Sequence, residues 1–85
     1  MPDQGNQSPA RYDDQIDSAV LDLLVEDHPG LWAVEEIERM IGVPLATYDS
    51  LRRLQGMGLV HRLKGDDRFV FASRAGVRGR ELGEF

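Results

Sequence analysis

The amino-acid sequence predicts a small α+β domain in which three helices precede a β-hairpin. Apolar residues recur at helical spacing in three successive segments, and glycine- or proline-containing turns separate those segments. Two strand-like segments then flank a polar turn near the end of the chain. Because the chain has 85 residues, we expect one domain, over residues 13–76.

The first helix is expected from about residue 14 to residue 27. Its apolar residues follow the i, i+3, i+4, i+7, i+8 spacing of one helix stripe: Ile16, Ala19, Val20, Leu23 and Leu24. The residues before it, 1–12, include two prolines and no aliphatic side chain larger than alanine after Met1. That composition predicts a disordered N-terminal arm.

A short strand at 31–33 and a second helix at 34–41 follow. Gly42 supplies a positive φ after the second helix, and Pro44 suits the first turn of a third helix over about 45–57.

The third helix has two expected faces. Its buried stripe consists of Tyr48, Leu51 and Leu54. The outward face then carries small, polar and charged residues: Ala46, Thr47, Asp49, Ser50, Arg52 and Arg53.

The segments 59–63 and 68–72 read as two strands joined by a four-residue turn, residues 64–67. Trp32 is expected to add a third strand to this hairpin and to cover the core with Phe69 or Phe71. Residues 77–85 form either a C-terminal tail or a short helix.

The chain resembles a winged helix-turn-helix domain, and within that class the MarR-type transcriptional regulators. The matching motifs are Glu36-Ile37, Ile41-Gly42-Val43, Thr47-Tyr48, Leu51-Arg52-Arg53-Leu54, Gly58-Leu59-Val60, Asp67-Arg68 and Ser73-Arg74-Ala75-Gly76. The resemblance implies a small regulator that binds double-stranded DNA sequence-specifically. Helix 45–57 would enter the major groove, and the hairpin of residues 59–72, the wing, would contact the backbone or the minor groove. Because one such domain makes few base contacts, we expect a homodimer on a two-fold site.

The charge distribution is compatible with this function, although the chain has a net charge of -5. Residues 1–30 contain one arginine against seven acids, whereas residues 39–80 contain nine basic residues against three acids. An acidic total can therefore accompany a basic face.

The expected DNA-contacting residues are side chains of the third helix and the wing. From the helix they are Ala46, Thr47, Ser50, Arg52 and Arg53, and from the wing Arg62, Lys64 and Arg68. Hydroxyls and guanidinium groups can read base edges or bind phosphates, and an alanine can touch a thymine methyl. The alternative is an ordinary solvated helix face and charged hairpin. We expect Asp49 to pair with Arg52 or Arg53.

Other function classes have little support. The chain has no cysteine, no glycine-rich phosphate loop and no histidine with a partner at metal-ligand spacing, so we expect no enzyme activity, metal or cofactor. No small-molecule substrate is evident. No apolar run approaches the ~20 residues that span a bilayer, and the first residues lack the apolar core of a signal peptide. These features favour a cytoplasmic protein.

A second hypothesis belongs to a different class. Winged-helix domains can also bind proteins, because a fold does not determine a function. The acidic first helix, Glu38 and Asp49 favour such a protein-interaction module without DNA binding. The two hypotheses differ in whether the basic residues share one face or acids interrupt it.

Overall fold

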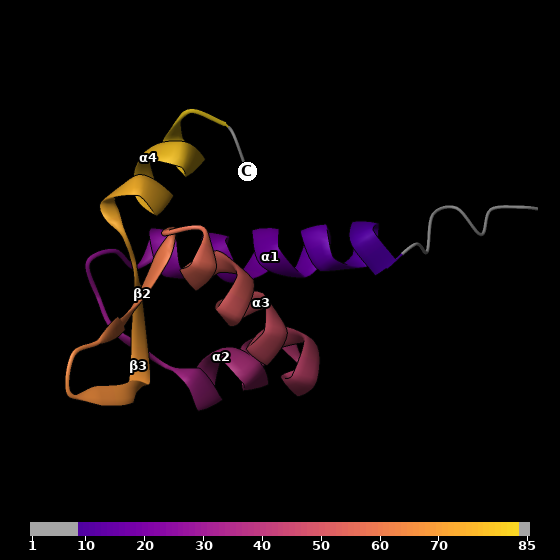
Figure 1. Ribbon diagram of the computed structural model, residues 1–85, viewed down its shortest axis with the longest axis horizontal. Helices are drawn as coiled ribbons and strands as arrows, with labels where there is room; N and C mark the ends of the chain where they lie inside the picture. Colours follow the sequence, from indigo (N-terminus) through magenta and orange to yellow (C-terminus); the bar gives the residue numbers. More distant parts are fainter. Residues whose placement is uncertain (1–8, 84–85) are drawn as a thin grey trace, which may run out of the picture.

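The computed structural model describes residues 9–83, with side chains described from residue 12 onward. This part of the chain folds into four helices and a three-stranded antiparallel sheet (Figure 1). The elements in chain order are α1 (Pro9–Glu26), β1 (Trp32–Ala33), α2 (Val34–Ile41), α3 (Pro44–Gly56), β2 (Val60–Leu63), β3 (Asp66–Ala72) and α4 (Arg74–Glu81). The predicted α+β class is confirmed.

Two predicted boundaries differ from the structure at the ends of the domain. α1 begins at Pro9, so residues 9–12 of the expected arm are helical, and residues 1–8 lie outside the described residues. The boundary expected after residue 76 falls inside α4.

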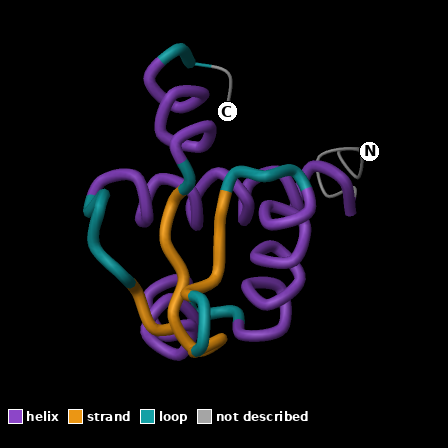
Figure 2. Tube along the Cα trace, turned by 60° about the vertical axis from the view of Figure 1, so that its left-hand side comes forward, coloured by secondary structure: helices purple, strands orange, loops and turns teal. Residues whose placement is uncertain are grey.

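The sheet has the order β1-β3-β2, with both pairings antiparallel. Trp32 lies opposite Val70, which confirms the short edge strand expected around this tryptophan. His61 of the edge strand β2 lies opposite Phe71 of the central strand β3. α1, α2 and α3 lie on one side of the sheet, and α4 extends from the end of β3 that is far from the hairpin turn (Figure 2).

The hairpin turn is shorter than expected. Leu63 pairs with Asp66, so the turn consists of Lys64 and Gly65 rather than four residues. Gly65 adopts φ = 92°, a left-handed conformation that a residue without a Cβ adopts at little cost. The register shifts between Arg62 and Leu63, where β2 and β3 diverge from regular pairing.

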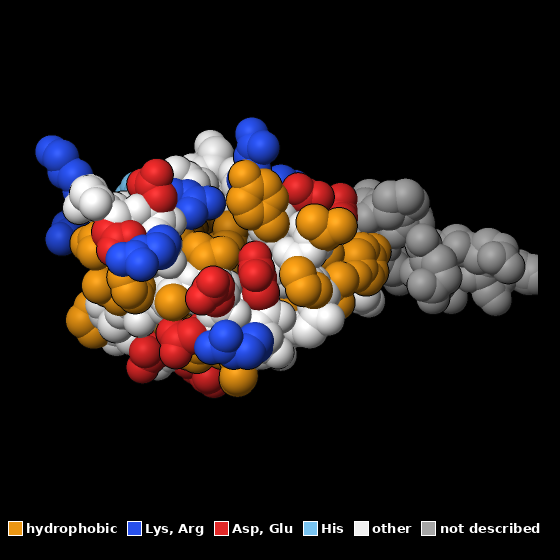
Figure 3. All heavy atoms as spheres, turned by 90° about the horizontal axis from the view of Figure 1, so that it is seen from below, with side chains coloured by type: hydrophobic (Ala, Val, Ile, Leu, Met, Phe, Trp, Pro, Cys, Tyr) orange, Lys and Arg blue, Asp and Glu red, His pale blue; other side chains and the backbone are white. Residues whose placement is uncertain are grey.

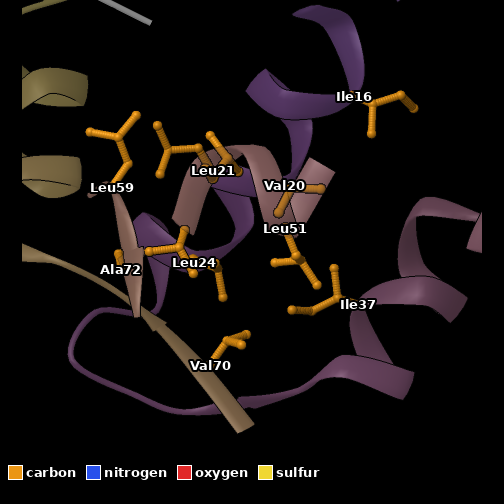
Figure 4. Close-up of a cluster of buried hydrophobic side chains, with 11 residues drawn as sticks. Ile16, Val20, Leu21, Leu24, Ile37, Leu51, Leu59, Val70 and Ala72 are labelled. Atoms are coloured by element: carbon orange, nitrogen blue, oxygen red, sulfur yellow. The ribbon is translucent and has the colours of Figure 1, made fainter. Parts of the chain in front are cut away.

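The core fills the space between α1, α2, α3 and the sheet. Side chains of α1 project toward Leu51 of α3 and Ile37 of α2 (Figure 4). The buried residues of α1 are Ile16, Val20, Leu21 and Leu24. Ala19, expected in that stripe, is exposed, because the buried face of α1 extends to Leu21, on the side of the helix away from Ala19.

α4 is tied to the rest of the domain at both of its ends. The Ser73 hydroxyl accepts a hydrogen bond from the Gly76 amide at 3.0 Å, as a helix N-cap does, and donates one to the Gly58 carbonyl at 2.6 Å. Near the other end, Arg80 forms an ion pair with Asp22 of α1. The segment expected as a tail or short helix is therefore, over residues 77–81, a helix attached to α1.

Of the helices described in residues 9–83, none combines the length and apolarity needed to cross a bilayer.

The close approach of α4 to the segment before β2 predicts a strong effect at Gly76. A Cβ at this position would lie 2.3 Å from the Leu59 carbonyl oxygen, which also accepts a hydrogen bond from the Ser73 amide at 2.9 Å. Because backbone atoms cannot yield as a flexible side chain can, Gly76→Ala should lower the free energy of unfolding by about 1–3 kcal/mol in urea denaturation.

Gly56→Ala is the matched control. This helical glycine has open space around its Cβ position and no left-handed φ, so alanine should leave stability unchanged or raise it slightly. Equal destabilisation by the two substitutions would contradict the packing of α4.

Candidate functional site

The face that α3 turns toward the core contains three of the residues expected to contact DNA. Thr47 and Ser50 are 0% exposed, and Ala46 packs against the hydrophobic core. The expectation that these side chains point outward is wrong. α3 packs against both α1 and α2, so its buried face is wide. Besides Leu51 and Leu54, this face includes the small polar side chains of Thr47 and Ser50.

The carboxylate of Asp17 on α1 accepts hydrogen bonds from both Ser50 and Arg53. The Ser50 hydroxyl donates to Asp17 at 2.5 Å, and Arg53 donates to the same carboxylate through Nε at 3.2 Å and Nη2 at 2.8 Å. Asp13 lies 3.7 Å from the Arg53 guanidinium. The hydrogen bonds that Arg53 donates to Asp17 raise the pKa of Arg53; partial burial opposes this effect, and the charges of Asp17, Asp13 and Asp49 add to it.

We expected Asp49 to pair with Arg52 or Arg53, but Arg53 forms its ion pairs with acids of α1 instead. The Arg53 guanidinium is therefore directed away from the exposed face of α3. Of the five helix residues expected to contact DNA, Arg52 alone is exposed in the structure.

Four exposed residues of α3 form what we call the α3 surface: Leu45, Tyr48, Asp49 and Arg52. The ends of the helix, at Pro44, Gln55 and Gly56, are exposed as well. Leu45 is 81% exposed and Tyr48 45% exposed. The expectation that Tyr48 is buried is wrong, because Thr47, not Tyr48, takes the place one turn before Leu51.

Exposed apolar side chains are concentrated at this end of the molecule, and the sequence analysis missed them. Eight large hydrophobic side chains are exposed among the described residues, and four of them lie within residues 40–48. Besides Leu45 and Tyr48 they are Met40 and Val43. For Leu45, Tyr48 and Arg52 the sequence signal is the i, i+3, i+7 spacing, which places these three side chains on one stripe of α3.

The three wing residues expected to contact DNA occupy different environments. Arg62 joins the hairpin to α3, because it donates to the Gln55 side chain at 3.1 Å and to the Asp67 carbonyl at 2.7 Å. Arg68 pairs with Asp66 at 2.9 Å, and hydrogen bonds from Arg68 lower the pKa of Asp66. Lys64 is exposed in the turn.

No continuous basic area forms on the face that carries α2 and the hairpin turn. On that face, acidic and basic side chains alternate among apolar ones (Figure 3). The acids that interrupt it include Asp66, which neutralises Arg68, and the exposed Asp67. This face therefore lacks the uninterrupted basic surface that the DNA-binding hypothesis expects.

No family model matches the chain, and neither the curated proteins nor the solved structures include a match. Within the described residues, no group of three or more histidine, cysteine, aspartate or glutamate side chains could hold a metal ion.

The Asp17 contacts predict a specific loss of stability. Asp17→Ala should leave the buried Ser50 hydroxyl and the Arg53 guanidinium without their common acceptor. We expect the free energy of unfolding to fall by about 1–3 kcal/mol in urea denaturation.

Asp14→Ala removes an exposed acid from the same helix, for which the structure gives no ion pair within the described residues, and should change stability by less than about 0.5 kcal/mol. If both substitutions cost the same, the Asp17 network does not hold α3 against α1.

Proposed function

We propose that this chain is a winged-helix protein-interaction module and that the α3 surface is its docking surface. The helix and strand order, with a hairpin following α3, is compatible with the winged-helix resemblance. The observation that carries the proposal is the chemistry of the α3 surface, where Leu45 and Tyr48 occupy the exposed positions at the start of the helix.

This chemistry suits a polypeptide better than a duplex. Base readout in the major groove uses short polar side chains and forked donors, and phosphates repel a carboxylate. The α3 surface offers a leucine, a tyrosine and Asp49 near its start, with Arg52 one turn further on. Aromatic and aliphatic anchors beside a charged pair are typical of protein interfaces.

The charges indicate which partner fits. The chain has a net charge of -5, and Asp49 lies within the α3 surface while Glu38 precedes it on α2. A partner segment with apolar side chains and a net positive charge would complement both features. A second acidic copy of this chain would carry the same sign of charge, so the homodimer expected for DNA binding receives no support from this surface.

DNA binding remains the second candidate, because two cations support it. Arg52 on α3 and Lys64 in the hairpin turn are exposed, and the structure gives neither an ion pair within the described residues. Exposed ion pairs such as Arg68–Asp66 contribute little to folding stability, so Arg68 could leave Asp66 and bind a phosphate. Such binding would rest on phosphates rather than on base contacts.

The interaction-module proposal predicts that a partner binds through Leu45 and Tyr48. Tagged wild-type chain and its Leu45→Ser/Tyr48→Ser variant would be used to recover proteins from the source cells, and any protein retained by wild type alone would be purified. In isothermal titration calorimetry with that purified protein, the double variant should bind at least about tenfold more weakly, as expected when two anchors are lost.

Met57→Ser is the matched control, because Met57 is also a large exposed apolar residue but lies after the end of α3. It should leave the affinity unchanged. The proposal fails if no protein distinguishes wild type from the double variant, or if the Met57 variant weakens binding equally.

The same proposal predicts that duplex DNA does not bind in a salt-dependent manner. Fluorescence anisotropy of a labelled mixed-sequence duplex, measured at low salt and then across a salt series, should give no saturable curve.

The opposite outcome would establish the second candidate. Micromolar binding that weakens steeply with salt, with a slope reduced by about two in Arg52→Ala/Lys64→Ala, would place phosphates on α3 and the hairpin turn. Arg78→Ala on α4 is the control and should leave that slope unchanged.

A further inference from the structure

A cleft of about 610 Å³ lies between the loop that follows α1, the sheet and α4, and no residue of the α3 surface lines it. These three segments lie on the same side of the molecule in Figure 1. The volume falls within the range of small-molecule sites, about 300–1,000 Å³. Nothing in the proposed interaction function uses this cleft.

The floor of the cleft is apolar because of strand alternation. Val60, Val70 and Ala72 of the sheet are buried in the core, so their neighbours His61 and Phe71 lie on the opposite face. The Phe71 ring meets the His61 ring edge-on, with centroids 5.8 Å apart.

Three aliphatic side chains from three segments extend this floor. Leu63 of β2, Leu31 of the loop after α1 and Val77 of α4 all line the cleft. Leu31 is 47% exposed, so apolar surface in this cleft is in contact with solvent.

The rim is cationic. Arg74 and Arg78 lie four residues apart on α4, so both project from the same side of that helix as Val77. Other arginines of the domain, Arg53, Arg68 and Arg80, pair with aspartates, whereas the structure gives Arg74 and Arg78 no ion pair within residues 9–83. The rim also contains one acid, Glu81.

We propose that this cleft binds a small amphipathic monocarboxylate. The apolar body of the ligand lies on Phe71, Leu63 and Val77, and its carboxylate pairs with Arg74 and Arg78. The two arginines and the glutamate give the rim a net charge of one positive unit. One carboxylate would neutralise this charge, whereas a dianion would leave an excess negative charge.

The donors of the cleft fit a carboxylate in geometry as well as in charge. A guanidinium presents parallel N–H donors that match the two carboxylate oxygens. The rings of His28 and His61, which also line the cleft, offer further N–H groups.

Sodium octanoate is the probe, and amide chemical shifts of the ¹⁵N-labelled chain are the measurement. Octanoate should shift the amides of Leu31, Leu63, Phe71 and Val77 along one saturable curve. Octan-1-ol and octylammonium, which have the same apolar body without the negative charge, should bind at least about fivefold more weakly. Equal binding of octan-1-ol, or saturable shifts confined to the α3 surface, would overturn the proposal.

Two double variants test the arginines. Arg74→Gln/Arg78→Gln should weaken octanoate binding by at least about fivefold. Arg39→Gln/Arg52→Gln removes the same charge from exposed positions on α2 and α3 and should leave the affinity unchanged. Equal losses in both variants would indicate long-range electrostatics instead of a site on α4.

Discussion

The contact between α3 and the Asp17 carboxylate determines which residues of α3 are exposed on the surface of this domain. Ser50 and Arg53 lie three residues apart on α3, and both donate to that one carboxylate from α1. Because the two donors share a helix face, their common acceptor fixes the rotation of α3 about its own axis. The Ser50 side chain is 0% exposed, so its hydroxyl could not lose Asp17 without becoming a buried, unpaired polar group.

That rotation decides the chemistry of the exposed face. With Thr47 and Ser50 turned into the core, the residues left outside at the start of α3 are Leu45, Tyr48 and Asp49. A rotation that exposed the hydroxyls would bury Tyr48 and give a surface suited to base readout. Our proposal of a protein partner therefore rests on an internal ion pair, although none of the residues in that pair lies on the α3 surface.

The sequence predicted the features that depend on neighbouring residues. The bounds of α2 follow from its apolar spacing and from Gly42, whose φ is 86° in the structure. Features that depend on distant residues were not predictable in the same way. Ser50 and Asp17 are 33 residues apart, so nothing near Ser50 indicates that its hydroxyl has a buried acceptor. Tyr48 was misplaced for a simpler reason: the spacing Tyr48, Leu51, Leu54 drifts around a helix, whereas Thr47, Leu51, Leu54 stays on one face.

The distribution of charge explains why the basic excess of residues 39–80 does not create a basic surface. Arg53 and Arg80 pair with acids of α1, and Arg68 pairs within the hairpin, so ion pairs within the domain neutralise part of that excess. The acids of α1 are therefore not a separate acidic face that leaves the rest of the domain basic. Arg74 and Arg78 differ because their neighbours in space are the apolar floor of a cleft and a single glutamate. Local pairing, and not the charge of a sequence segment, determines where this acidic chain can attract an anion.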